Sequence, residues 1–303
     1  MPVFLTLLAR LCVVLLLGNA ASAQSLSYVG SDTCSDCHAD QADLWKGSQH
    51  ALAWTRPTPQ TMLGDFNDAE FDDGKTVTRF STREGEYFVT VTEMDGQTTQ
   101  YKVHSAAGIA PLQQYLLETE PGRQQSLDVV WDVEQERWYN LYPDQVLPPD
   151  DGLHWSGPYK TWNGRCAECH ATGYQRNYGA RTGKYTSTTA EMGVGCEACH
   201  GQASAHLGWT EGQDVLAGGP PNIDAYGFPI GVKAIGDQQC AACHSRRESL
   251  LGGNPNPGTP FADAYTLATL RPGLYEADGQ IKDEVYVYGS FLQSKMFARG
   301  VGC

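Results

Sequence analysis

The sequence of 303 residues predicts a mainly α-helical and irregular fold with a small β-rich insert. Three observations support this expectation. A short pattern, Cys-x-x-Cys-His, occurs four times, and its spacing suits one helical turn. The 33 glycines and 16 prolines indicate many loops. Strand-like alternation of apolar and polar side chains is concentrated in residues 64–148.

Residues 1–23 have the pattern of a secretory signal peptide. Arg10 supplies a positive charge, an apolar core follows it, and Ala21-Ser22-Ala23 resembles a cleavage site. A retained membrane anchor is the alternative, but Arg10 leaves the apolar stretch short for a span. We therefore expect export to the periplasm and no membrane span in the mature chain.

Residues 24–63 should form the first helical segment. Ser31 can cap a helix over the first cysteine motif. Helical spacing over 42–53 predicts a second helix that carries His50, ended by the prolines that follow.

Residues 64–148 should form the β-rich insert. Strands are expected at 76–81, 87–92, 101–104 and 138–142, with an Asp-Gly hairpin turn before the third. Residues 109–119 have helical spacing of apolar side chains and are predicted as a helix.

The remaining chain divides into two segments. Residues 149–245 hold three of the four motifs, too close in sequence for each to build its own core, and so predict one compact cluster. Residues 246–303 predict a hairpin over 275–288 and a helix over 291–299.

The four motifs have the residues that attach haem c covalently. Two thiols can add to the vinyl groups of a haem, and the next histidine can bind the iron. Zinc ribbons built from the same cysteine pairs are the alternative, but ribbons do not need a histidine after each pair. We therefore expect four haem c groups and a haem-packed, multihaem cytochrome c fold. The motifs are Cys34-Ser-Asp-Cys37-His38, Cys166-Ala-Glu-Cys169-His170, Cys196-Glu-Ala-Cys199-His200 and Cys240-Ala-Ala-Cys243-His244.

Two of the ten cysteines lie outside the motifs. Cys12 belongs to the apolar leader. Cys303 is the last residue, and we expect it to be the first cysteine of a fifth haem motif cut off at this point. A free C-terminal thiol is the alternative. No cysteine pair is left over for a structural disulfide.

The axial ligands decide between two functions. Each motif histidine, His38, His170, His200 and His244, should supply one ligand to its iron. The other four histidines, His50, His206, His154 and His104, are candidates for the second ligand. Two histidines on one iron suit electron transfer, whereas an open position suits binding of a small molecule.

The net charge of −14 excludes a nucleic-acid partner, because such proteins present basic surfaces. It favours docking to basic or neutral redox proteins. We expect other cytochromes or quinol-linked donors as these partners.

Several spaced stretches resemble multihaem cytochromes of the cytochrome c-554 type, a group that often carries tetratricopeptide repeats after the haem part. The resemblance implies mainly bis-histidine haems in closely stacked pairs, an electron-transfer role and a fifth motif after Cys303. The stretches are 28–31 before the first motif, Trp45-x-x-Ser48-x-His50, 64–68, 111–116, 153–155, and 196–201 with His206.

The sequence therefore favours a periplasmic electron-transfer protein over a catalyst. The alternative is a multihaem reductase or oxidase of a small nitrogen or sulfur compound, with a five-coordinate haem. Wider relatives of this kind use a lysine-ligated haem or a cross-linking tyrosine, and no Cys-x-x-Cys-Lys occurs here.

Overall fold

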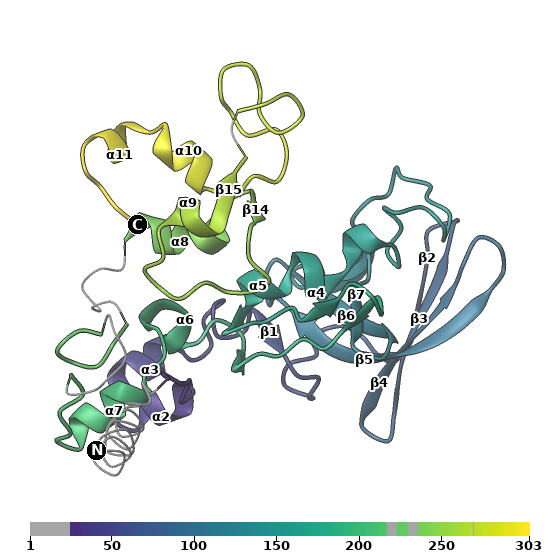
Figure 1. Ribbon diagram of the computed structural model, residues 1–303. Helices are drawn as coiled ribbons and strands as arrows, with labels where there is room; N and C mark the ends of the chain where they lie inside the picture. Colours follow the sequence, from purple (N-terminus) through teal and green to yellow (C-terminus); the bar gives the residue numbers. More distant parts are fainter. Residues whose placement is uncertain (1–24, 217–222, 230–235, 269) are drawn as a thin grey trace, which may run out of the picture.

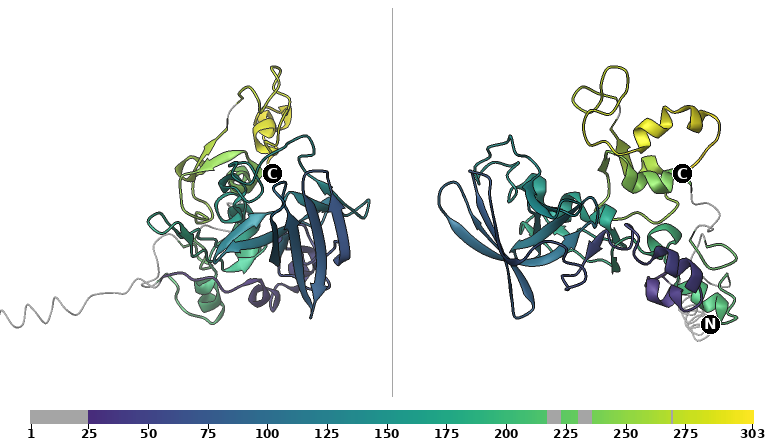
Figure 2. Two further views of the ribbon diagram at one scale, coloured as in Figure 1. Left: turned by 90° about the vertical axis from the view of Figure 1, so that its right-hand side faces the viewer. Right: turned by 180° about the vertical axis from the view of Figure 1, so that it is seen from behind.

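The computed structural model describes residues 25–216, 223–229, 236–268 and 270–303. The predicted signal peptide, residues 1–23, lies outside the described residues. A large twisted sheet occupies one side of the molecule and short helices occupy the other (Figures 1 and 2). Among the described residues, no helix is both long and apolar enough to cross a bilayer.

The prediction of a mainly helical fold is wrong. Helices account for 21% of the structure and strands for 27%, and the sheet between residues 54 and 140 is antiparallel with nine strands. Its main path runs β2-β3-β4-β5-β6-β8-β9, with β1 paired to β5 and β7 paired to β6. The strands are β1 (Trp54–Thr55), β2 (Asn67–Asp72), β3 (Val77–Arg83), β4 (Glu86–Thr92), β5 (Thr98–Ala107), β6 (Leu112–Glu120), β7 (Arg123–Ser126), β8 (Val129–Asp132) and β9 (Arg137–Asn140).

The predicted helix over 109–119 is instead strand β6. Leu112, Tyr115 and Leu116 repeat at helical spacing, but the strand is buried on both faces, so both odd and even positions are apolar. Tyr115 and Leu117 enter the main sheet core, whereas Leu116 packs into a second core beside the second cysteine motif. Burial on two faces removes the alternation that normally marks a strand.

Aromatic side chains fill the main sheet core. Phe80 is fully buried and stacks on Trp138, with ring centroids 3.5 Å apart. Phe66 meets Phe80 edge-on at 5.5 Å and Tyr115 edge-on at 5.1 Å. The core therefore joins strands β3, β6 and β9 around Phe66, which lies in the loop before β2.

The helices are short, and their bounds correct two expectations. The predicted helix over 42–53 ends at Trp45, and His50 lies in a turn after Gly47, whose φ is +80°. The predicted helix over 291–299 is broken in two. The helices are α2 (Ser31–Ser35), α3 (Ala39–Trp45), the 3-10 turn η1 (Pro158–Lys160), α4 (Trp162–Arg165), α5 (Ala167–His170), α6 (Cys196–His200), α7 (Ser204–Thr210), α8 (Asp237–His244), α9 (Phe261–Ala264), α10 (Tyr288–Leu292) and α11 (Lys295–Ala298).

Three two-stranded ribbons complete the fold. The hairpin expected over 275–288 contains one isolated bridge, Tyr275 to Ile281, before α10 begins. The ribbons are β10 (Ala171–Thr172) with β13 (Glu191–Met192), β11 (Tyr178–Gly179) with β12 (Lys184–Tyr185), and β14 (Arg247–Ser249) with β15 (Tyr265–Leu267).

We predict that Phe80→Ala lowers the free energy of unfolding by about 3–5 kcal/mol, because it removes a fully buried ring and leaves a cavity. Met94→Ala is the control: Met94 is 51% exposed, and its loss should change stability by less than about 0.5 kcal/mol. Urea titration followed by circular dichroism measures both. Equal effects would contradict this account of the core.

Candidate functional site

Each cysteine motif lies on or beside a short helix. Helices α5, α6 and α8 all end on their motif histidine. In the first motif, Cys34 lies in α2 and His38 immediately precedes α3. The cysteines of the described residues are free thiols: Cys34, Cys37, Cys166, Cys169, Cys196, Cys199, Cys240, Cys243 and Cys303.

A buried carboxylate joins the first and third motifs. Glu197, inside the third motif, is 2% exposed and accepts backbone N–H bonds of 2.8–3.0 Å from Val29, Gly30 and Ala203. Helix α2 consequently packs against α6, although the β-rich insert separates them in sequence. Glu197 was not predicted from the sequence. Its position between the two cysteines of the motif is the feature that could have indicated its role.

A serine hydroxyl adds a second link at the same junction. Ser31 Oγ donates to Glu191 Oε2 at 2.8 Å and accepts from the backbone N–H of Cys196 at 3.1 Å. Ser31 was expected to cap α2. It makes no such cap, and its side chain instead ties α2 to the start of α6.

Helix packing places the motifs in a defined order. Helix α2 of the first motif packs against α6 of the third, and α5 of the second motif packs against α8 of the fourth. In α8, Gln239 Nε2 donates to the carbonyl of Ala198 inside the third motif at 3.2 Å, which joins the third motif to the fourth. The resulting order is first, third, fourth, second.

Cys303 lies against the fourth motif. Its backbone N–H donates to Asp237 Oδ1, at the start of helix α8, at 2.6 Å. The residue expected to begin a fifth motif is therefore next to the fourth.

Burial raises the pKa of Cys34 and that of Cys166 to about 12. No group of three or more His, Cys, Asp or Glu side chains is arranged to hold a metal ion in the part of the chain that the structure describes.

The rings of His38 and His206 face one another. Their centroids are 6.4 Å apart and their planes differ by 21°. His206 Nδ1 donates to the carbonyl of Tyr226 at 2.8 Å, so its Nε2 carries the lone pair that a metal would use. Phe228 stacks on His206 at 4.6 Å and limits its rotation.

His50 and His244 form a second pair. Their ring centroids are 6.0 Å apart, and their planes differ by 80°. The carbonyl of His50 accepts the N–H of Val194 at 2.9 Å, which fixes the turn that carries it.

Both pairs fit an iron bound between two imidazoles. Two metal–nitrogen bonds of about 2 Å, together with two ring radii of about 1.1 Å, separate the centroids by about 6.2 Å. Burial lowers the pKa of His200 and His244, which favours the neutral imidazole that binds metal. The cysteine motifs and histidine pairs together fit haem c.

The other two motif histidines differ in their hydrogen bonds. His170 Nδ1 donates to the carbonyl of Ala53 at 2.9 Å, and its ring lies 5.0 Å from Trp162. His200 is near Phe228, with centroids 6.3 Å apart, and its Nδ1 is buried without a partner among the described residues.

His104, a predicted second ligand, has both ring nitrogens in hydrogen-bonding contact. Nδ1 lies 2.8 Å from the Ser105 hydroxyl and Nε2 lies 3.1 Å from the Gln124 amide. Trp54 separates it from the second motif, lying 6.4 Å from His104 and 5.5 Å from Trp162. The structure does not bring His104 to a motif histidine.

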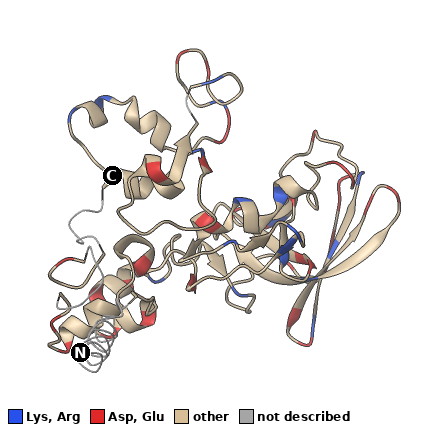
Figure 3. Cartoon of the chain, viewed as in Figure 1, with Lys and Arg blue, Asp and Glu red and all other residues tan. Residues whose placement is uncertain are grey.

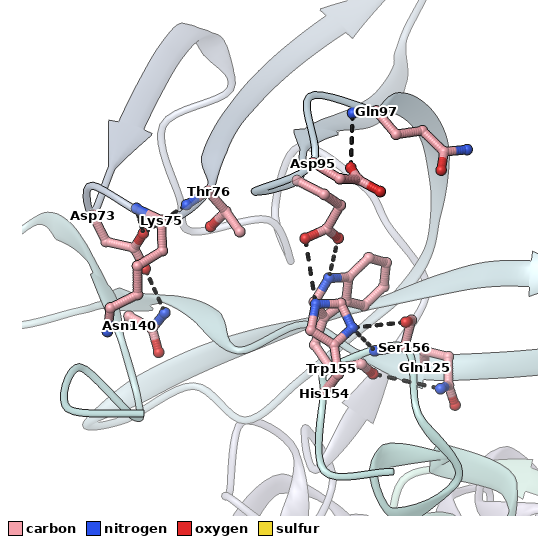
Figure 4. Close-up of polar contacts among 11 residues, drawn as sticks. Asp73, Lys75, Thr76, Asp95, Gln97, Gln125, Asn140, His154, Trp155 and Ser156 are labelled. Carbon is pink, nitrogen blue, oxygen red and sulfur yellow. Dashed lines mark hydrogen bonds and ion pairs between the residues drawn. The ribbon is translucent and has the colours of Figure 1, made fainter. Parts of the chain in front are cut away.

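His154, the remaining candidate, belongs to the edge of the sheet core. Nδ1 contacts the Ser156 hydroxyl at 2.8 Å, and Nε2 contacts Glu93 at 3.3 Å. Trp155 donates to the same carboxylate at 2.9 Å, as Figure 4 shows. These contacts turn the imidazole toward the β-rich insert.

One protein family and one solved structure resemble this chain. The family described as cytochrome c554 and c-prime matches residues 33–108 and 155–201, which include three motifs and His50. The crystal structure of the outer cell wall cytochrome OcwA shares the fold, with a TM-score of 0.58 and 18% sequence identity over 88% of this chain. This chain spans 51% of that structure. No curated protein gave a match.

The cysteine motifs and these matches support a multihaem c-type cytochrome. Within that class, the matched segments are similar to the cytochrome c554 type. The same matches support haem c as the cofactor and a role in electron transfer.

We predict that Glu197→Ala lowers the free energy of unfolding by about 2–4 kcal/mol, because it leaves one buried and two part-buried N–H groups without their acceptor. Glu197→Gln should cost less, since one amide oxygen can still accept. The control is Glu248→Ala, an exposed site on β14, expected to lie within about 0.5 kcal/mol of the parent. Urea unfolding provides the measurement, and equal losses for Glu197→Ala and the control would rule out this role.

Proposed function

We propose that this protein carries electrons between redox partners through four covalently attached haem c groups, with two histidines on most irons. Each haem, when bound, supplies a one-electron iron couple. The observation that carries the proposal is the pairing of His38 with His206 and of His50 with His244 at 6.4 and 6.0 Å.

The chain's own residues would hold and orient the groups. The four cysteine pairs would attach them, and His38, His170, His200 and His244 would each supply a proximal ligand. His206 would serve the first motif rather than its own, and His50 would serve the fourth. Second ligands from His104 and His154 stay predictions of the sequence, and their present hydrogen bonds favour structural roles.

The packing of the motif helices supports an electron path that departs from the order of the sequence. Adjacent motifs would bring their porphyrin edges close together, and the helix contacts run first, third, fourth, second. The first motif would then be one end of the path and the second motif the other.

Charge near the first motif supports docking of a basic partner at that end. Asp32, Asp36, Asp40 and Asp43 are exposed around α2 and α3, and Lys46 is the nearest basic residue along the chain (Figure 3). Attraction between this acidic surface and a basic redox protein would weaken as salt increases. The periplasm remains our proposed location, in line with c-type cytochromes as a class.

We predict four haems per chain by the pyridine haemochrome assay when the protein is made with a maturation system. Replacing Cys240 and Cys243 together by alanine should leave three, because thioether bonds retain the haem during denaturation. Replacing Cys303 by alanine is the matched control and should leave four. A colourless protein with the mass of the bare polypeptide would refute the proposal.

We further predict that His206→Ala and His50→Ala each convert one iron from low spin to high spin in electron paramagnetic resonance. The nearly parallel and nearly perpendicular ring planes should give the two lost low-spin signals different anisotropies. His104→Ala and His154→Ala are controls that should keep the parent spectrum.

A parent spectrum with a high-spin signal that shifts on adding nitrite or hydroxylamine would favour the enzyme alternative. Loss of a low-spin signal in the control variants, but not in His206→Ala or His50→Ala, would refute the ligand assignment.

A further inference from the structure

A buried arginine contacts two haem motifs at once. Arg247, the first residue of β14, donates from Nε to the carbonyl of Ala242 inside the fourth motif at 2.6 Å. Its Nη2 donates to the sulfur of Cys169 in the second motif at 3.4 Å. The guanidinium therefore bridges the junction where α5 packs on α8.

The charge of Arg247 is balanced by one carboxylate. Its Nη2 lies 3.3 Å from Oε1 of Glu168, which stands between the two cysteines of the second motif. The Arg247 side chain is 8% exposed and that of Glu168 is 17% exposed. Water and salt therefore screen the pair little.

Neighbouring side chains hold the pair in place. The hydroxyl of Tyr265 donates to Glu168 Oε1 at 2.8 Å, and the Ser249 hydroxyl donates to the same oxygen at 3.3 Å. The guanidinium lies over the Tyr265 ring, 3.8 Å from its centroid. Tyr265 is 3% exposed, so the pair has a fixed position relative to both motifs.

We propose that Arg247 and Glu168 shift the reduction potentials of the haems attached at the second and fourth motifs in opposite directions, so that the intact pair keeps both potentials balanced. The inference rests on the proposed function, because it requires haem at both motifs. A reduced iron carries one positive charge fewer than an oxidised iron, so a nearby cation favours reduction and a nearby anion opposes it. With both partners present, the two effects largely cancel at the junction.

Removing the carboxylate and removing the guanidinium should therefore shift the midpoint potentials in opposite directions. Glu168→Gln leaves the guanidinium uncompensated and should raise two of the midpoint potentials. Gln keeps an oxygen that can accept from Tyr265 and Ser249, so the local packing is retained. Arg247→Gln leaves the carboxylate uncompensated and should lower the same two potentials.

The experiment is a spectroelectrochemical redox titration of the haem-loaded full chain. Each single variant should change the reduction equilibrium of two haems about tenfold or more, where tenfold equals about 59 mV for one electron. The double variant should return close to the parent values, and Arg247→Lys should stay close to them as well. Arg246→Gln is the matched control, since Arg246 is exposed and its guanidinium donates to the carbonyl of Glu284 rather than to a haem motif.

Haem content is measured first, so that a failure of the proposed function can be distinguished from a failure of the role of the Arg247–Glu168 pair. A parent protein without haem at these motifs would refute the proposed function. Full haem content with unchanged potentials, or shifts of the same sign in Glu168→Gln and Arg247→Gln, would overturn the role of the pair. If Glu168→Gln fails to fold, Arg247→Gln compared with Arg247→Lys still tests the sign.

Discussion

The buried carboxylate of Glu197 is the constraint on which the haem region depends. It accepts hydrogen bonds from backbone N–H groups that precede the first motif and from one that follows the third motif. Buried N–H groups without partners are costly, so this carboxylate fixes the approach of two segments that have little apolar surface of their own. Glu168 plays a comparable part at the other junction, where its partners come from β14 and β15. In the second and third motifs, this glutamate is one of the two residues between the cysteines.

The sheet packs against the haem region and shares a hydrophobic core with it. Strand β1 follows the turn of His50 and pairs with β5, and Trp54 brings this strand into the core that contains Cys166. Leu116 of β6 enters that core from the sheet. The carbonyl of Ala53, one residue before β1, accepts from His170. A single sheet edge thus positions the histidine turn of one motif and the imidazole of another.

Much of the site could be predicted from the sequence, because Cys-x-x-Cys-His specifies its chemistry within five residues. His50 and His206 were recognisable as ligand candidates, but the sequence could not tell which motif each would face, since that depends on α2 packing against α6. The strands at 76–81 and 87–92 were predictable from alternation. Strand β6 was not, because burial on both faces gives Leu112, Tyr115 and Leu116 a helical period. The expected helical character of the whole chain failed because the motif helices span only four to eight residues, and the insert contributes most of the strand structure.

The pairing of His38 with His206, and of His50 with His244, also bears on how the haem region closes. The partners of both pairs lie on either side of the sheet in the sequence, so each pair closes a loop that contains it. Closing a loop costs conformational entropy that increases with the length of flexible chain. A sheet that folds first therefore shortens the flexible chain that each imidazole pair has to close.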